Sequence, residues 1–282
     1  MIEQREIPIA QACSALKLSR SNFYSQIKKE RQEDLDTYLR KEIEGIALEF
    51  PFYGYRRIFR ELRRRDVLVN HKKVLRLMRE DSLLCRRKKA FRPVTTDSDH
   101  NYNIYPNLIK NKEVAGLNEV WVSDITYVRL LHEFIYLAAI TDIFSRKCIG
   151  WALGRTIDTN LALEALTMAI RNRDYLGLSN LIHHSDRGVQ YASNEYVELL
   201  TQRGIQISMS ASGNPYENAF AESFNKTIKV EEVYIKEYET FEDALKNIKH
   251  FIETVYNRKR LHSSIGYVPP EEFEREVLKA KL

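Results

Sequence analysis

The stretch Leu181–Val230 decides the fold of this chain, beginning L-I-H-H-S-D-R-G and ending A-F-A-E-S-F-N-K-T-I-K-V. An apolar run carries Asp186 to a turn marked by Gly188, and 35 residues then separate Asp186 from Glu222, which lies in a helical pattern. Upstream, W-V-S-D-I-T-Y-V places Asp124 in a strand, where Asp is depleted and an unpaired carboxylate is costly. Three such acids together predict an all-oxygen site for Mg²⁺ or Mn²⁺.

The composition indicates a cytoplasmic protein with no membrane partner. The chain has 282 residues and 44% hydrophobic content, which predicts one main domain with smaller ones attached. No run approaches the ~20 apolar residues of a membrane helix, and the N-terminus lacks a signal-peptide pattern. The three cysteines are widely spaced and form no C-x-x-C, which is typical of a reducing compartment.

The charge is distributed unevenly along the chain. Residues 1–95 hold 23 Lys and Arg against 13 Asp and Glu, a net charge of +10, whereas residues 96–282 have a net charge of −5. A basic front half attached to a mildly acidic body favours a polyanion-binding module joined to another domain.

Two helical segments make up this front half. Residues 1–30 contain two short helices with a break near residues 18–19, capped by Ser19, and we interpret them as a helix-turn-helix-like segment. Residues 31–92 form a basic helical DNA-binding region, although simple helix packing and a solvated charged surface are the alternatives. The predicted phosphate contacts here are Arg56, Arg57, Arg60, Arg63, Lys72 and Arg76.

A linker at 93–118 precedes an α/β core predicted at 119–235. The patterns in the core give three strands, a helix, a strand, a helix, a strand and a helix. This order predicts a mixed five-stranded sheet with flanking helices, the element order of the ribonuclease-H-like fold. Residues 236–282 add an amphipathic helix and a basic tail that continue the core.

Five motifs occur in order along this core and tail. They are W-V-S-D-I-T-Y-V, D-I-F-S-R-K-C-I-G-W, H-H-S-D-R-G-V-Q-Y, G-N-P-Y-E-N-A-F-A-E-S-F-N-K-T-I-K and Y-N-R-K-R-L-H-S-S-I-G-Y-V-P-P-E-E-F. Together with the 35-residue interval they resemble the OrfB-type DDE transposases of bacterial insertion sequence family three, which are similar to retroviral integrases. F-Y-G-Y-R-R-I resembles the family's second helical DNA-binding region.

The resemblance implies that Asp124, Asp186 and Glu222 are a catalytic triad that holds two divalent metal ions, Mg²⁺ or Mn²⁺. The residue types suit this role, because carboxylates neutralise and position charge around an in-line phosphodiester attack without a covalent nucleophile. One such site can both cleave and transfer strands. The alternative to a catalytic role for these acids is helix capping or ordinary surface charge.

Several neighbours are expected to support the triad. Asn218, four residues before Glu222, and His184, beside Asp186, are predicted to act next to the ligands. Asp142 is not expected to ligate metal, and His183 and His184 are expected to pack rather than to bind zinc, since no paired cysteines accompany them. Further predicted DNA contacts are Lys226, Lys229, Arg258, Lys259 and Arg260.

The sequence thus predicts a nucleoid-associated DNA transposase subunit that acts on the terminal inverted repeats of its element and on target DNA. The resemblance implies a copy-out route through a circular intermediate, and a homo-oligomer on paired ends. It also implies an upstream-frame product of OrfA type as fusion or partner, because no sustained heptad is present here.

Two rival functions share part of this pattern. A DNA-binding regulator derived from a transposase would keep the fold without cutting DNA, and the intact triad argues against it. A ribonuclease-H-type or structure-specific nuclease would share the carboxylates but would not need the long basic front half. Strand transfer to a second duplex distinguishes a transposase from both.

Overall fold

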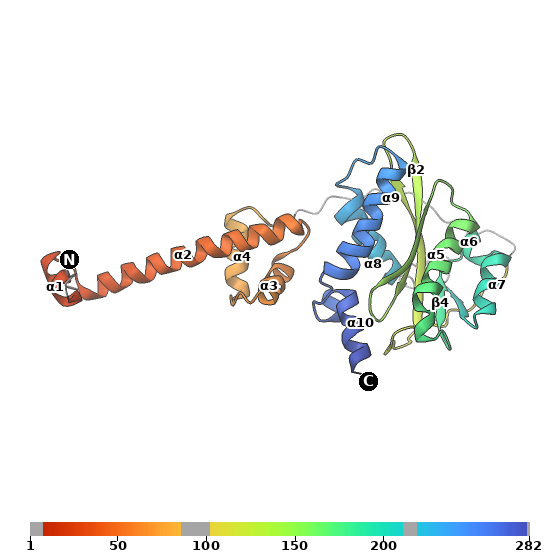
Figure 1. Ribbon diagram of the computed structural model, residues 1–282, viewed down its shortest axis with the longest axis horizontal. Helices are drawn as coiled ribbons and strands as arrows, with labels where there is room; N and C mark the ends of the chain where they lie inside the picture. Colours follow the sequence, from red (N-terminus) through yellow and green to blue (C-terminus); the bar gives the residue numbers. More distant parts are fainter. Residues whose placement is uncertain (1–7, 86–101, 211–218, 281–282) are drawn as a thin grey trace, which may run out of the picture. The chain divides into compact units, whose positions relative to one another are not determined.

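The computed structural model describes residues 8–85, 102–210 and 219–280, and it divides the chain into two compact units, Met1–Lys88 and Lys89–Leu282 (Figure 1). Asn218 and residues 93–101 of the predicted linker lie outside the described residues, whereas residues 102–118 of the linker are described. Across the described ranges, no helix is both long and apolar enough to cross a membrane.

The first unit is built from four helices. They are α1 (Ile9–Ala15), α2 (Arg20–Glu49), α3 (Tyr55–Arg64) and α4 (His71–Glu80). The predicted break before α2 is confirmed, and the Ser19 hydroxyl accepts a hydrogen bond from the Asn22 N–H at 3.1 Å. The boundary expected between residues 30 and 31 falls inside α2, which continues for 30 residues because no Gly or Pro interrupts its first 25.

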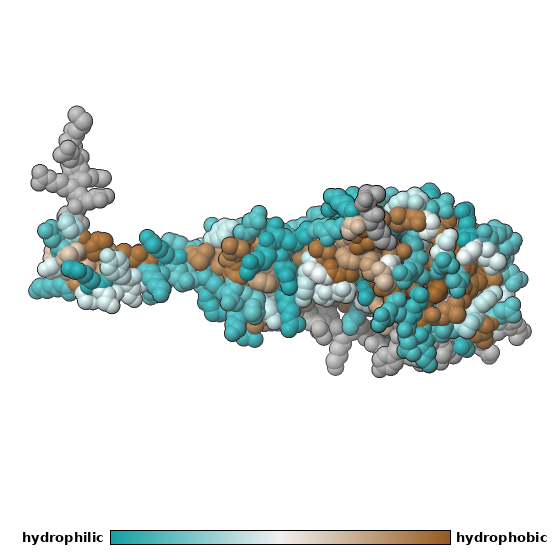
Figure 2. Space-filling model, turned by 90° about the horizontal axis from the view of Figure 1, so that it is seen from below, coloured by the Kyte–Doolittle hydropathy of each residue, from teal (hydrophilic) through white to brown (hydrophobic). Residues whose placement is uncertain are grey.

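The second half of α2 packs against α3 and α4 around a small apolar core. Its members are Leu39, Ile43, Ile46, Ile58, Leu62, Val74, Leu77 and Met78. The α1 end of the unit is different, because Leu16 and Tyr24 are 68% and 56% exposed. Figure 2 shows apolar side chains at the surface of that end.

The second unit contains the predicted mixed five-stranded sheet. Its strands are β1 (Val120–Arg129), β2 (Phe134–Asp142), β3 (Cys148–Gly154), β4 (Ile182–Ser185) and β5 (Gln206–Met209). The order across the sheet is β3-β2-β1-β4-β5. The pairs β1–β2 and β2–β3 are antiparallel, whereas β1–β4 and β4–β5 are parallel.

Helices cover both faces of this sheet (Figure 1). One face packs on α5 (Thr159–Arg173), α6 (Val189–Ala192) and α7 (Asn194–Gln202), through a core that includes Ile125, Ala138 and Leu166. The other face packs on the C-terminal helices, through a core that includes Leu137, Phe224 and Ile252. These helices are α8 (Ala219–Ile228), η3 (Lys229–Val233), α9 (Phe241–His250), η4 (Phe251–Lys259) and α10 (Pro270–Lys279).

The described residues of this unit also include two short 3₁₀ turns, η1 (Asp174–Leu176) and η5 (Ser263–Ile265). Helix α5 approaches the edge strand β3 very closely at Gly150, where a Cβ would collide with the carbonyl oxygen of Ala165. A glycine is therefore required at this position of the D-I-F-S-R-K-C-I-G-W motif for packing, not for a turn.

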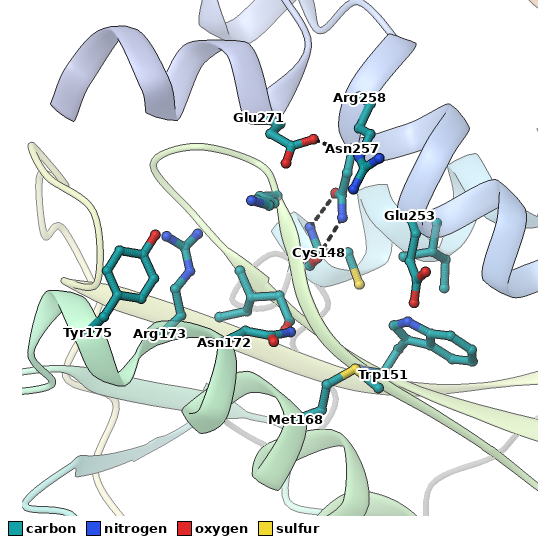
Figure 3. A pocket seen from close by; sticks show the side chains of 13 residues that line it. Cys148, Trp151, Met168, Asn172, Arg173, Tyr175, Glu253, Asn257, Arg258 and Glu271 are labelled. Carbon is teal, nitrogen blue, oxygen red and sulfur yellow. Dashed lines mark hydrogen bonds and ion pairs between the residues drawn. The ribbon is translucent and has the colours of Figure 1, made fainter. Parts of the chain in front are cut away.

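Side chains cap the free edge of β3. The Asn257 amide accepts from the Cys148 N–H at 3.0 Å and donates to the Cys148 carbonyl at 2.8 Å, as a neighbouring strand would (Figure 3). From α5, Asn172 donates to the Ile149 carbonyl at 2.9 Å. Because an exposed edge can pair with other strands, this capping protects the sheet from edge-to-edge association.

Replacing Asn257 with Ala is expected to lower the free energy of unfolding by roughly 2 kcal/mol, because two buried backbone groups lose their partner. Urea unfolding of the purified protein measures the change. Asn247→Ala on α9 is the matched control, since that amide bonds only within its own helix. Equal losses in the two variants would contradict the capping role.

Candidate active site

Asp124 lies in the middle of β1, opposite Ala139 of β2, with its carboxylate half-buried. One oxygen accepts the Ile125 N–H at 3.0 Å, and the other accepts the Asn225 side-chain amide at 2.8 Å. Burial, and after it the negative charges of Asp186 and Glu222, raise the pKa of Asp124 to about 7, although its two hydrogen bonds act to lower it. The carboxyl group therefore lies where an added positive charge would be favourable.

Asp186 follows directly after β4, the parallel neighbour of β1. Val122 pairs with His184, so continuing this register by two residues places Asp186 beside Asp124. The Asp186 carboxylate accepts the Gly188 N–H at 2.9 Å, which forms the tight turn that the sequence predicts. The turn directs the chain away from the sheet and leaves the acid at the strand end.

Glu222 lies in the first turn of α8, with an exposed side chain. The preceding residue, Ala221, is buried against Val120 and Val122 of β1 and Ile182 of β4, so α8 docks directly on the two strands that carry the other acids. The structure thus brings Asp124, Asp186 and Glu222 from three separate elements into electrostatic contact.

The acids do not form a closed ligand set. Within the described residues, no group of three or more His, Cys, Asp or Glu side chains is arranged to hold a metal ion. The chemistry of the set still suits a divalent cation, since all the donors are carboxylate oxygens and their mutual repulsion raises the Asp124 pKa. Of the three acids, Glu222 is exposed and lies on the first turn of its helix.

Asn225 is a site residue that the sequence analysis missed. Its amide donates to Asp124, while its buried Oδ1 has no hydrogen-bond partner among the described residues. The signal was present, because Asn225 lies three residues after Glu222 and therefore on the same side of the helix. Asn225 connects the helix of the third acid to the strand of the first.

The two histidines of the H-H-S-D motif are buried, as predicted. His184 Nδ1 lies 2.8 Å from the Ser208 hydroxyl of β5, which also accepts the Leu108 N–H at 2.8 Å. His183 Nε2 lies 2.9 Å from the Tyr196 hydroxyl of α7. Both rings therefore bond β4, the strand that precedes Asp186, to neighbouring elements. A supporting role of His184 toward Asp186 stays a prediction.

Burial lowers the pKa of His183 to about 3, well below its ordinary value of 6.5. Below about pH 6.5 the unfolded chain therefore binds a proton on His183 that the folded chain does not bind. The free energy of unfolding should fall as the pH drops from 6.5 towards 3. The expected contribution is about 1.4 kcal/mol per pH unit in this range. Urea unfolding of wild type and His183→Gln at several pH values checks it, and equal pH slopes for both would contradict it.

Asp142 has a different role from the three acids. Its carboxylate accepts the backbone N–H groups of Asn118 at 2.9 Å and Ser145 at 3.0 Å. These bonds fix the turn between β2 and β3 and join it to the segment before β1. This agrees with the expectation that Asp142 is not a metal ligand.

Two lysines follow Glu222 on the same helical face. Lys226 is exposed, whereas Lys229 is half-buried with its ammonium 3.8 Å from the centre of the Tyr127 ring. Burial lowers the pKa of Lys229 to about 8, although the charge of Asp124 acts to raise it. Positive charge therefore lies beside the three carboxylates.

The tail residues differ in their accessibility. Arg258 and Lys259 are exposed, and Arg258 pairs with Glu271 at 3.0 Å. Arg260 is buried and donates through Nε and one terminal nitrogen to the two carboxylate oxygens of Glu231, at 2.7 and 2.6 Å. The DNA contact predicted for Arg260 is therefore not retained, because its guanidinium joins the tail to η3.

In the first unit, α3 and α4 carry the other predicted DNA contacts. The exposed side chains are Arg56, Arg60, Arg63 and Lys72, and Arg57 is half-buried. Arg76 is exposed but bonded to Asp36 of α2 at 2.5 Å and to Glu80 at 2.9 Å. Although burial acts to raise it, hydrogen bonds from Lys73, Arg76 and Gln32 lower the pKa of Asp36 to about 2. Arg76 therefore joins α4 to α2.

The cavity shown in Figure 3, about 340 Å³, lies apart from the three acids. It is lined by residues of β3, α5 and η4, such as Trp151, Met168 and Asn257, and contains none of the three carboxylates. The cavity is therefore a separate feature of the unit from the surface on which the three acids lie.

Comparison with known proteins shows which domains the chain contains. An integrase core domain matches residues 115–215, a second integrase core description matches 203–270, and an HTH-like domain matches 34–91. The fold, the acids and these matches define an integrase-type polynucleotidyl transferase. The protein InsF, a transposase for insertion sequence IS3A of Escherichia coli K12, is 33% identical over 98% of this chain and 96% of its own length.

The "insertion element IS600 uncharacterized 31 kDa protein" of Shigella sonnei is 36% identical over 94% of this chain and 97% of its own length. The chain belongs to this IS3 family of insertion-sequence transposases, as the sequence motifs predicted. Among solved structures, it is similar to the HTLV-2 integrase catalytic core, at 19% identity and a TM-score of 0.40, covering 52% of this chain and 91% of that one.

Proposed function

We propose that Asp124, Asp186 and Glu222 are the catalytic acids of this transposase and hold divalent metal, two Mg²⁺ or Mn²⁺ ions. The observation that carries the proposal is the gathering of three carboxylates around β1 and β4, where burial, together with the charges of Asp186 and Glu222, raises the pKa of Asp124 to about 7. When bound, the metal would polarise the scissile phosphodiester and lower the pKa of the attacking water or 3′-hydroxyl.

The chain's own residues would position the reacting strands. Asp124 is held by the sheet and by Asn225, Asp186 by its turn, and Glu222 by the docking of α8. Lys226 and Lys229 add positive charge beside the acids, where the phosphates of an element end would lie. A preorganised arrangement of this kind lowers the barrier mainly by placing charge, not by forming covalent intermediates.

The DNA substrates would be the terminal inverted repeats of the element and the target duplex. We assign backbone contacts in the first unit to Arg56, Arg57, Arg60, Arg63 and Lys72, and in the second unit to Lys226, Lys229, Arg258 and Lys259. Because two ends must be cut and joined, we propose a homo-oligomer on paired ends. An upstream-frame product of OrfA type, as fusion or partner, would add specificity for the element ends. Transposition would follow a copy-out route through a circular intermediate. The protein would act in the cytoplasm, at the nucleoid.

A strand-transfer assay tests the proposal. Labelled element ends are incubated with the purified chain, alone and fused to its upstream frame, in Mg²⁺ or Mn²⁺. Joined products are expected, since a transposase transfers strands whereas a nuclease only hydrolyses. Hydrolysis without joining would favour a nuclease, and DNA binding without any cutting by either form would favour a regulator.

Two arginines of the first unit should respond differently to substitution. Arg60→Ala removes a phosphate contact, so the slope of log affinity against log salt should fall by about 0.9. Arg76→Ala should leave this slope unchanged but lower the melting temperature, because α4 loses one of its two ion pairs with Asp36. Fluorescence anisotropy with DNA at several salt concentrations and thermal melts measure both, and matching behaviour of the two variants would contradict the assignment.

A further inference from the structure

The turn between β2 and β3 holds a cation that the proposed function does not use. Arg146 has a φ of +65°, a left-handed conformation that residues other than Gly seldom adopt. Its backbone N–H donates to the Asp142 carbonyl at 2.9 Å, and the Asp142 carboxylate fixes the same turn through Ser145. The fold thus maintains Arg146 in a costly backbone conformation.

The guanidinium of Arg146 faces the ring of Phe220 on α8. Its central carbon lies 4.2 Å from the ring centre, well within the range of a cation–π interaction. The Nε atom is buried, and across the described ranges it has no hydrogen-bond partner. Arg146 as a whole is half-buried and Phe220 is 38% exposed, so the pair is partly removed from water, which strengthens such an interaction.

Phe220 lies two residues before Glu222, in the same turn of α8. On the other side of Glu222, Asn225 donates to Asp124. Ala221, between Phe220 and Glu222, is buried against β1 and β4 and allows a close approach to the strands. The backbone that carries Glu222 is therefore attached to the sheet on both sides of the acid.

We propose that Arg146 is a positioning residue that, through Phe220, sets the distance of the Glu222 carboxylate from Asp124 and Asp186. The inference rests on the proposed role of Glu222 as a catalytic acid. Arg146 itself does not touch DNA in this account. Arg146 lies on the β2–β3 turn, which the Asp142 carboxylate fixes. The D-I-F-S-R-K segment would therefore support the active site by positioning Glu222, and not by binding metal.

A double-mutant cycle tests the inference. Arg146→Ala and Phe220→Leu should each weaken Mn²⁺ binding, measured by calorimetry, by about fivefold, because a partly exposed cation–π pair is lost. The combined variant should bind Mn²⁺ no more weakly than either single one, and Arg146→Lys should recover part of the loss. Affinity for element-end DNA should stay within about twofold of wild type for every variant.

Three outcomes would overturn it. DNA affinity that falls with Arg146→Ala would identify a phosphate contact instead. Losses that multiply in the combined variant, or an unchanged Mn²⁺ affinity, would show that the two side chains do not act together on the site. Arg171→Ala, an exposed arginine on α5, is the matched control. If Arg146→Ala does not fold, as thermal melts would show, Arg146→Lys and Phe220→Leu carry the same test.

Glu222→Gln separates this inference from the function on which it rests. If Glu222→Gln keeps wild-type Mn²⁺ affinity and strand transfer, the proposed triad fails. If Glu222→Gln loses both while Arg146→Ala and Phe220→Leu keep both, the triad stands and only the positioning role of Arg146 is wrong.

Discussion

Replacing Glu222 with Gln is expected to reduce strand cleavage and strand transfer by about a thousandfold while leaving DNA affinity nearly unchanged. Metal ions supply several kcal/mol of charge stabilisation to phosphoryl transfer, and about 1.4 kcal/mol corresponds to a tenfold change in rate. Glu222 is exposed on the first turn of α8, so the substitution removes one charge without opening a cavity. Single-turnover assays with labelled element ends measure the rate.

The same substitution should lower the pKa of Asp124, because the charge of Glu222 is one of the causes that raise it. Glu237→Gln, an exposed acid in the segment after η3, is the control and should keep wild-type activity. If Glu222→Gln retains more than a few per cent of strand transfer, Glu222 is not the third acid. If it loses DNA affinity in step with activity, its role is binding instead of chemistry.

Replacing Asn225 with Ala is expected to weaken metal binding or slow cleavage by about 10- to 100-fold, the usual effect of removing a group that orients a metal ligand. The amide of Asn225 donates to Asp124 at 2.8 Å, and without it the carboxylate loses both its orientation and a hydrogen bond that lowers its pKa. Mn²⁺ calorimetry and single-turnover cleavage measure the two effects separately.

Ser223→Ala is the matched control for Asn225, because it changes an exposed side chain on the same helix. Asn225→Asp makes the test stricter, since it would place a fourth carboxylate against Asp124 and should harm metal-free stability more than Asn225→Ala does. A variant Asn225→Ala that only melts at lower temperature, with unchanged Mn²⁺ affinity and cleavage, would show that the bond to Asp124 serves packing alone.

The sheet and the positions of the three acids could be predicted from the sequence because their signals are local, and the catalytic role of the acids stays a proposal. Asp124 stands in an apolar strand, Asp186 follows another, and the alternation of strands and helices implies the layered core. Because β1 and β4 are parallel neighbours, an acid inside β1 and an acid just after β4 can lie side by side without knowledge of the helix packing. The recognised motifs then supplied the roles of the three residues.

Partners that lie far apart in the sequence could not be predicted in this way. Counting charges marked Arg76 and Arg260 as DNA contacts, but their acids, Asp36 and Glu231, are 40 and 29 residues away and meet them only after the helices pack. Likewise, the bond of Asn225 to Asp124 depends on how α8 docks on β1. Side-chain pairing between elements is a property of tertiary packing, which periodicity does not encode.

The most direct test of the proposed site is anomalous diffraction from crystals of the protein with element-end DNA and Mn²⁺. The account predicts anomalous peaks about 2.1 Å from carboxylate oxygens of Asp124, Asp186 and Glu222, with the scissile phosphate beside them. Peaks at other residues, or a metal held by Asp124 and Asp186 while Glu222 points away from it, would contradict the account.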